Sequence, residues 1–239
     1  MNAITEAIVL AGGLGTRLRS VVGATPKALA PVADRPFLDW LLDDLRAHGI
    51  GRVVLATGYG SESIEDRYGG GYPGLSIVVS REDEPLGTGG AIRLGCTRTT
   101  TPHVLAVNGD TFAAWQAERF TAVADRTGAP VTVGLKRMKN PDRYGTVTLA
   151  GDWLTAFHEK RAIPEGLINA GAYLLETARV PWPAGERFSF EHDVLEAACS
   201  RGSLAGTILD GPFIDIGIPE SFAEAQTAIP AWAREAVRR

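Results

Sequence analysis

A glycine-rich segment directly after an apolar run is the feature that most constrains this chain. Residues 7–11 are small or apolar, and they continue into the letters GGLGTRLR. Glycines in this position permit positive φ and let backbone N–H groups approach an anion closely. Arg17, and Lys27 ten residues later, add a planar guanidinium and a point charge that suit phosphate oxygens. The pattern predicts a buried strand whose following loop binds phosphate, although a tight turn with surface cations is the alternative.

Two common phosphate-binding loops do not fit these letters. The P-loop requires a Gly-Lys pair, and none occurs in the chain. The dinucleotide fingerprint requires a third glycine where this chain has Leu18. A dehydrogenase is therefore disfavoured.

The first part of the chain alternates between strand-like and helix-like patterns. Apolar runs that predict buried strands are residues 7–11, 52–57, 75–79, 104–107 and 131–135. Helices are predicted between them, at residues 37–50, 62–69, 89–96 and 115–128. In the first of these helices, Leu38, Leu41, Leu42 and Leu45 share one face, and Gly49 follows at the C-terminal end.

The pattern changes in the second part of the chain. Residues 145–160 predict a hairpin around Gly151-Asp152, and strands are predicted at residues 167–176, 204–209 and 212–217. Two helices are predicted, at residues 187–202 and 219–229, the first with Phe190, Val194, Leu195 and Ala198 on one face. We expect one α/β domain, residues 1–239, built on a doubly wound, mostly parallel, Rossmann-like sheet. Its first half covers about residues 1–135, and residues 136–239 form a smaller lobe that closes the fold.

Composition excludes several classes of protein. The 239 residues are 45% hydrophobic and 22% charged with a net charge of −4, which does not indicate a nucleic-acid binder. The basic run at residues 136–139 is interpreted as a solvated loop, or as the rim of an anion site. Two distant cysteines give neither a disulfide framework nor a metal-ligand spacing. Without a signal peptide pattern or a membrane-spanning run, a cytoplasmic protein with no membrane partner is expected.

Two aspartates follow short apolar runs. Asp110 lies in LAVNGDTF and Asp215 lies in PFIDIGIPESF. Ligands bind at the carboxyl ends of strands in an open parallel sheet, and carboxylates there hold Mg²⁺ against phosphate oxygens. The pair therefore predicts one shared metal site, while helix caps or turn residues are the alternative for each aspartate alone.

Three further motifs interrupt predicted strands with polar residues or glycine. They supply Tyr144 and Gly145, Glu159 and Lys160, and Asn169 and Gly171. Such donors and acceptors at fixed positions suit the hydroxyl groups of a sugar, and a lysine suits its phosphate. Exposed hairpin residues are the alternative.

At this point a resemblance explains the motifs together. The letters LAGGLGTRLR…PKALAPVADRPFL resemble the nucleotide-binding signature of the sugar-1-phosphate nucleotidyltransferases, and the later motifs follow in that family's order over essentially the whole chain. The resemblance implies a nucleotide-diphospho-sugar transferase fold with a small sugar-binding lobe. It implies nucleotide contacts from Leu10, Ala11, Gly12, Gly13, Gly15, Thr16, Arg17, Lys27, Gly87, Thr88 and Asp110.

The same resemblance assigns the remaining roles. Asp110 and Asp215 bind catalytic Mg²⁺, and Arg17, Lys27, Asp110 and Lys160 carry the catalysis. The sugar phosphate is bound by Tyr144, Gly145, Glu159, Lys160, Asn169 and Gly171. Arg161 stands where many members have proline, which puts the shape of that loop in question.

The base that the nucleotide carries is less constrained. Gly87, Thr88, Gly89 and Gly90 are expected to open a helix with free N–H groups, and Gly87 matches a base-contacting position of the family. Guanine needs hydrogen-bond acceptors, for which Glu82, Asp83 and Glu84 are candidates, although a solvated acidic turn fits equally well.

Within the family, the chain most resembles the heptose-1-phosphate guanylyltransferases. This resemblance implies GTP and D-glycero-α-D-manno-heptose 1-phosphate as substrates, a GDP-heptose product for surface polysaccharides such as capsule, and a homodimer. Mannose-1-phosphate guanylyltransferase and N-acetylmuramate-1-phosphate uridylyltransferase are the alternatives. A catalytically silent binding subunit of the same fold is a further alternative, which the intact Arg17, Lys27, Asp110, Lys160 and Asp215 disfavour.

Overall fold

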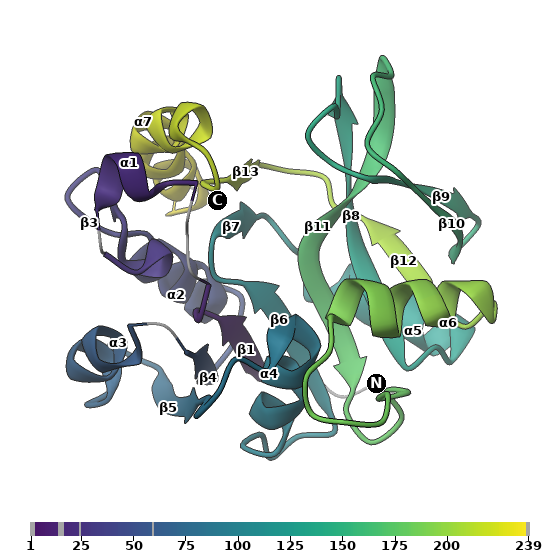
Figure 1. Ribbon diagram of the computed structural model, residues 1–239, viewed down its shortest axis with the longest axis horizontal. Coiled ribbons are helices and arrows are strands. Elements are labelled where there is room, and N and C mark those ends of the chain that lie inside the picture. Colours follow the sequence, from purple (N-terminus) through teal and green to yellow (C-terminus); the bar gives the residue numbers. More distant parts are fainter. Residues whose placement is uncertain (1–2, 14–16, 24, 59, 238–239) are drawn as a thin grey trace.

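The computed structural model describes residues 3–13, 17–23, 25–58 and 60–237. In this part of the chain, nine strands form one sheet in the order β5-β4-β1-β6-β11-β8-β12-β10-β9 (Figure 1). The first four strands are parallel, and they come from the first half of the chain: β5 (Ser76–Arg81), β4 (Arg52–Thr57), β1 (Glu6–Leu10) and β6 (His103–Asn108). Each of the four lies within one or two residues of its predicted range, because buried parallel strands are short apolar runs bounded by turns.

The second half of the sheet is mixed in direction. It contains β8 (Val131–Lys139), β9 (Thr146–Ala150), β10 (Trp153–His158), β11 (Glu165–Glu176) and β12 (Ala205–Ile208). Among the described strands, β10 and β11 run opposite to the other seven, so the prediction of a mostly parallel, doubly wound α/β sheet is confirmed. The last strand, β9, also pairs with β11, and the five strands of this half therefore close into a ring.

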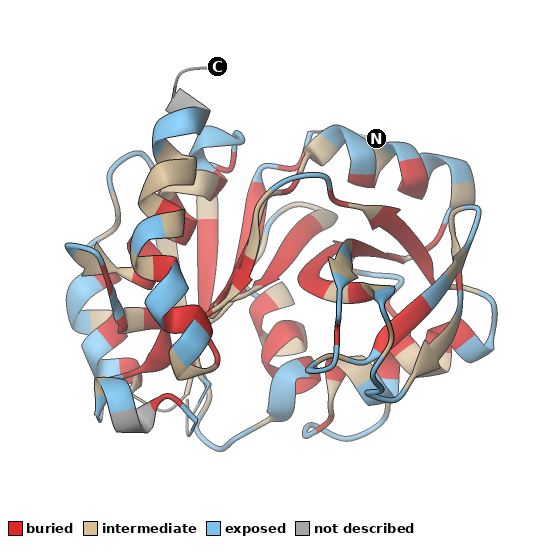
Figure 2. Cartoon of the chain, turned by 90° about the horizontal axis from the view of Figure 1, so that it is seen from above, coloured by how far each residue is buried: buried red, intermediate tan, exposed pale blue. Residues whose placement is uncertain are grey.

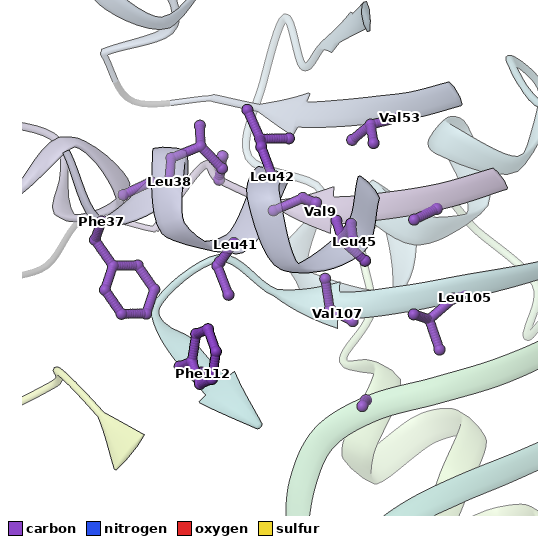
Figure 3. Packing of buried hydrophobic residues seen from close by; sticks show 14 of the residues in the cluster. Val9, Phe37, Leu38, Leu41, Leu42, Leu45, Val53, Leu105, Val107 and Phe112 are labelled. Atoms are coloured by element: carbon purple, nitrogen blue, oxygen red, sulfur yellow. The ribbon is translucent and has the colours of Figure 1, made fainter. Parts of the chain in front are cut away.

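Helices cover both faces of the sheet. On β1, Ala7 and Val9 face one hydrophobic cluster and Ile8 faces the other, as the two-residue period of a strand requires. The first cluster is covered by α2 (Phe37–Ala47), whose four predicted leucines pack against Val9, Val53, Leu105 and Val107 (Figure 3). Burying one leucine contributes about 2 kcal/mol. As Figure 2 shows, the buried residues follow the strands and the inner sides of the helices.

The remaining helices are arranged as follows. They are α1 (Arg19–Val22), the 3₁₀ turn η1 (Lys27–Leu29), α3 (Ser61–Tyr68), α4 (Gly87–Cys96), α5 (Ala117–Thr127), the π-helix η2 (Phe190–Glu196), α6 (Ala197–Ser200) and α7 (Pro219–Val237). The second face is covered by α4 and η2, which contribute Ile92, Phe190 and Val194 to the second cluster. None of the helices in the described residues is long and apolar enough to cross a membrane.

Two helices differ from the sequence prediction. The segment predicted as an α-helix at residues 187–202 begins as the π-helix η2, although its four predicted face residues are buried. Its first turn is held by side chains as well as by the backbone, since Phe190 N donates to Thr88 Oγ1 and His192 N donates to Ser189 Oγ. The last helix was expected to end at residue 229, before Pro230, but α7 continues to Val237. The ring of Trp232 packs 5.9 Å from that of Phe112, and this contact offsets the backbone bond that proline removes.

Two small pairs of strands lie outside the main sheet. One is the hairpin of β2 (Pro31–Val32) and β3 (Arg35–Pro36). The other joins β7 (Thr111–Ala113) to β13 (Phe213–Asp215), two strands that are far apart in sequence. This second pair brings Asp215 opposite Thr111 and thereby positions the candidate site.

Candidate active site

A cavity of about 230 Å³ opens where β1 and β6 end and where β11 passes them. Among the described residues, its walls include six that the sequence predicted: Arg17, Asp110, Tyr144, Asn169, Gly171 and Asp215. The lining is completed by Asn108, Thr111, Ala170 and Phe213, for which no role was predicted. Asn108 is the last residue of β6, so its place at a strand end was the signal that pointed to it.

The two aspartates and Lys27 form one cluster at this cavity. Lys27 is nearly buried, and its Nζ donates a hydrogen bond to Asp110 Oδ2 and lies 3.7 Å from Asp215 Oδ1. The pairing of β7 with β13 and a 3.0 Å bond from Ile216 N to Asp110 O hold the two aspartate backbones together. An ammonium group therefore lies between two carboxylates that are 105 residues apart in sequence.

Asp215 is fixed by several further contacts. Gly217 N donates to its Oδ1 at 2.6 Å, and the Tyr144 hydroxyl donates to its Oδ2 at 3.4 Å. Arg143, which the sequence analysis did not consider, places a guanidinium nitrogen 3.7 Å from the same Oδ2. Burial and the charge of Asp215 raise the pKa of Tyr144 to about 12, so its hydroxyl remains a donor at neutral pH.

The donor set of this cluster fits a magnesium ion. Carboxylate oxygens are the ligands that Mg²⁺ prefers, and a positive charge already lies between the two aspartates in the form of Lys27. No group of three or more acidic, histidine or cysteine side chains suited to a metal exists in the described residues. A metal at Asp110 and Asp215 would therefore complete its shell with water and substrate phosphate oxygens, as Mg²⁺ usually does.

The asparagine of β11 is held rigidly at an irregular point of the strand. The pairing with β8 shifts register between Asn169 and Tyr173, and Gly171 has φ +70°. Gly171 N donates to Asn169 Oδ1, and Asn169 Nδ2 donates to the Tyr173 hydroxyl, both at 2.9 Å. A Cβ at Gly171 would lie 2.6 Å from Asn108 Nδ2, so glycine is required for this approach. Burial raises the pKa of Tyr173, which keeps its hydroxyl neutral.

The glycine-rich loop begins where β1 ends. Leu10 is the last residue of β1, and Ala11 N bonds to Ala56 O at 2.8 Å. A Cβ at Gly12 would lie 2.8 Å from Gly58 N, whereas Gly13 has open space. Gly15 and Thr16 lie outside the described residues, and Arg17 reaches the cavity from beyond them.

The residues predicted to contact the base are engaged with the protein itself. Gly87 has φ +72°, and a Cβ there would lie 2.6 Å from Phe188 O. The Thr88 hydroxyl donates to Glu191 Oε2 at 2.7 Å and accepts from Phe190 N at 2.9 Å. Neither Gly87 nor Thr88 is among the described residues that line the cavity. The missing side chain of Gly87 and the hydroxyl of Thr88 therefore serve packing within the protein. The contact of these two residues with the nucleotide stays a prediction.

Of the three acidic candidates for base recognition, Glu82 is the one that accepts a backbone hydrogen bond and lies near the glycine-rich loop. Its Oε2 accepts a 2.9 Å bond from Leu86 N, and it lies near the contact between Gly12 and Gly58. Burial raises the pKa of Glu82. Asp83 and Glu84 are exposed.

The last predicted sugar contacts are not among the described residues that line the cavity. A Cβ at Gly145 would lie 3.0 Å from His158 O, which places Gly145 beside the end of β10. Glu159 and Lys160 follow directly after β10 and are exposed, and neither is among the described lining residues. The described lining residues likewise do not include Leu10, Ala11, Gly12, Gly13, Lys27 or Gly145.

The combination of a glycine loop, paired aspartates and a polar second lobe is that of a nucleotide-using transferase. The family model described as "Nucleotidyl transferase" matches residues 6–231, and the chain belongs to this family. It is 44% identical over 222 residues to a D-glycero-alpha-D-manno-heptose 1-phosphate guanylyltransferase of Aneurinibacillus thermoaerophilus, covering 92% of this chain and 96% of the relative. An enzyme of the same description from Campylobacter jejuni is 37% identical over 219 residues, which cover 91% of this chain and 96% of the relative.

Solved structures agree with this assignment. HddC from Yersinia pseudotuberculosis, also crystallised in complex with GMP-PN, is 30% identical and superposes with a TM-score of 0.84. The match covers 94% of this chain and 99% of HddC. The predicted fold type and the assignment to a transferase enzyme family are thereby confirmed.

Proposed function

We propose that this protein transfers a guanylyl group from GTP to D-glycero-α-D-manno-heptose 1-phosphate and releases pyrophosphate. Two heptose-1-phosphate guanylyltransferases match it over more than nine-tenths of its length, and HddC has been crystallised with GMP-PN. The observation that carries the chemistry is the cluster of Lys27, Asp110 and Asp215 at a cavity next to the glycine-rich loop.

Asp110 and Asp215 are the residues that would hold Mg²⁺. When bound, the ion supplies charge neutralisation at the α-phosphate and at the leaving pyrophosphate. Asp110 lies in the two-residue turn between β6 and β7, and Asp215 lies at the end of β13, so strands position both carboxylates.

The attacking group needs no strong general base. A phosphate oxygen of the sugar 1-phosphate is already an anion, and it forms the new bond to the α-phosphorus. The bond between the α-phosphorus and the bridging oxygen breaks, and its electron pair leaves with pyrophosphate. The chain's contribution is then positioning and charge stabilisation.

The basic side chains near the site are assigned to different substrates, some to GTP and one to the sugar 1-phosphate. Arg17 lines the cavity and Lys27 lies at its aspartates, so both suit the charge that develops on pyrophosphate. Lys160, on the exposed segment after β10, orients the attacking phosphate once substrate is bound. The fixed amide of Asn169, the backbone at Gly171 and the neutral Tyr144 provide hydrogen bonds for the sugar hydroxyls.

Glu82 is our candidate for guanine selection. Guanine presents N–H donors that need acceptors, and Glu82 is the acidic residue of its turn that approaches the Gly12–Gly58 contact. Gly87 and Thr88 would contribute backbone N–H groups at the start of α4. A homodimer in the cytoplasm, supplying GDP-heptose for surface polysaccharides, completes the proposal.

A substrate grid tests this function. Pyrophosphate release is measured for GTP, UTP, dTTP, ATP and CTP, each with heptose, mannose, glucose and N-acetylmuramate 1-phosphates, with Mg²⁺ and with a chelator. We expect Mg²⁺-dependent turnover with GTP and manno-configured sugars, and a higher kcat/KM for heptose than for mannose. Preference for UTP would overturn the specificity and keep the chemistry. No turnover from folded protein that binds nucleotide would instead identify a silent subunit.

A further inference from the structure

The loop between β8 and β9 places the guanidinium of Arg143 beside Asp215, one of the two aspartates that are proposed to bind the metal. Asn140 adopts φ +47°, and Tyr144 N bonds to Pro141 O at 2.9 Å, so the loop is a formed turn. Tyr144 packs edge-on against Phe213 at 6.1 Å, and the Arg143 guanidinium lies 5.4 Å from the centre of the Tyr144 ring. The turn therefore aims Arg143 at Asp215 Oδ2, 3.7 Å away.

The charges at this point balance within the protein. Asp110 and Asp215 carry two negative charges, and Lys27 and Arg143 carry two positive charges. A divalent cation bound by the same carboxylates repels both side chains and removes their partners. Arg143 has room to respond, because 39% of its side chain is exposed, whereas 10% of the Lys27 side chain is exposed.

We propose that Arg143 binds the phosphate of the sugar 1-phosphate and, before substrate arrives, serves as the counter-ion of Asp215. The planar fork of its guanidinium matches phosphate oxygens with two hydrogen bonds. Its place on the β8–β9 loop, next to Tyr144 and Gly145, assigns it to the sugar phosphate. Arg17 and Lys27 come instead from the nucleotide half. This inference rests on the proposed transfer to a sugar phosphate.

Because Arg143 changes its partner from Asp215 to the sugar phosphate, it affects metal binding and sugar-phosphate binding in opposite directions. It opposes metal binding to the substrate-free protein, and it supports sugar-phosphate binding in the loaded protein. A merely structural arginine would not have this pair of effects, so the two are measured together in Arg143→Gln and Arg143→Lys. The control is Arg126→Gln. It removes the same charge from α5, where Arg126 forms an exposed ion pair with Asp152 of the β9–β10 turn.

The first measurement is Mn²⁺ binding to substrate-free protein by electron paramagnetic resonance. We expect Arg143→Gln to bind Mn²⁺ about threefold more tightly, since a partly exposed competitor is lost. Arg143→Lys is expected to stay near wild type, because it keeps the charge. Equal Mn²⁺ affinity in Arg143→Gln, Arg126→Gln and wild type would overturn the counter-ion role.

The second measurement uses the nucleoside triphosphate and the sugar 1-phosphate that the wild type turns over best. The KM is determined for each of these two substrates. Arg143→Gln is expected to raise the KM of the sugar phosphate about 10- to 100-fold and to leave that of GTP within twofold. Arg143→Lys recovers part of this loss, because the lysine lacks the fork. A raised KM for GTP alone, or unchanged values, would overturn the phosphate assignment. Absence of turnover in the wild type is a different outcome, which overturns the proposed function together with this inference.

Discussion

The hydroxyl of Thr88 donates a 2.7 Å hydrogen bond to Glu191 Oε2, so the first turn of α4 is fastened to the π-helix η2 across 103 residues of sequence. The same hydroxyl accepts from Phe190 N, and Ser189 Oγ also donates to Glu191. Single-turn π-helices often mark functional sites. Here η2 borders the residues predicted to hold the base, so a nucleotide bound as proposed would be coupled to this packing.

The first prediction separates these two roles of Thr88. Thr88→Val keeps the shape and removes both hydrogen bonds, which is expected to lower the free energy of unfolding by about 1 kcal/mol. Thr88→Ser retains the hydroxyl and serves as the control. Urea unfolding gives the stability, and steady-state kinetics give the KM of GTP. A valine variant of normal stability with a raised KM would show that Thr88 acts on the nucleotide directly.

Several features of the fold followed from local sequence because their cause is local. The strands β1, β4, β5 and β6 are apolar runs, and α2 presents its leucines at helical spacing with Gly49 at φ +87° after it. The pairing of β7 with β13 depends on two three-residue segments that meet only in the folded chain. The π-helix and the extension of α7 past Pro230 were missed for the same reason, since contacts with other elements cause both.

The residues of the candidate site likewise fall into those that local sequence predicts and those that only the folded structure identifies. Asp110, Asp215, Asn169 and Gly171 were predicted because each follows or interrupts an apolar strand with an unusual residue type. Arg143 carries no such mark, and only its distance from Asp215 gives it a role. Asn108 does end an apolar strand, but its closeness to Gly171 is seen only in the folded chain. Lys160 is the opposite case, because its motif predicted a role for it, whereas in the structure Lys160 is exposed and is not among the described lining residues.

The second prediction concerns Lys27. Lys27→Met removes the ammonium group that lies between Asp110 and Asp215. In the proposed reaction this leaves Arg17 alone to stabilise the charge on the departing pyrophosphate. We expect kcat to fall about 10²- to 10³-fold, the usual effect of losing one preorganised electrostatic contact.

The measurement is kcat at saturating GTP and sugar phosphate over a range of Mg²⁺. Lys27→Arg keeps the charge with a different shape and is expected to lie between the two. Full recovery of the methionine variant at high Mg²⁺ would contradict a role on the leaving group, since it would mean that Lys27 only neutralises the aspartates.

The third prediction uses two glycines that share a backbone conformation. Gly171 has φ +70° and a blocked Cβ position 2.6 Å from Asn108 Nδ2, whereas Gly151 has φ +61° and open space. Alanine at either site costs about 1 kcal/mol of conformational strain. At Gly171 the contact with Asn108 adds to this loss and displaces the backbone that is proposed to bind the sugar.

Gly171→Ala is therefore expected to unfold at lower urea than Gly151→Ala and to raise the KM of the sugar phosphate. Gly151→Ala should keep normal kinetics, because its hairpin turn lies at the joint of β9 and β10. Adding Asn108→Ala to Gly171→Ala is expected to recover part of the stability. Equal unfolding of the two single variants would refute the steric argument.

The fourth prediction is the pH dependence that Asp44 introduces. Burial raises the pKa of Asp44 to about 6 from an ordinary 3.8, against the opposing attraction of His48, whose Nδ1 lies 3.5 Å away. Between these two values the folded chain binds more protons than the unfolded chain, so Asp44 makes stability fall as pH rises from about 4 to about 7. The difference of about 2 in pKa corresponds to about 3 kcal/mol at most.

Asp44→Asn removes this titration, and we expect it to stabilise the protein by about 2 kcal/mol at pH 8 and by little at pH 4. Asp152→Asn is the opposite control, because Arg126 lowers the pKa of Asp152 and its carboxylate stabilises the folded chain at neutral pH. Urea unfolding of the three proteins from pH 4 to 8 makes the comparison. The difference between Asp44→Asn and wild type should grow with pH, while Asp152→Asn should fall below wild type over the same range. A constant offset for Asp44→Asn would mean that hydrogen bonding or packing, and not the buried charge, accounts for its effect.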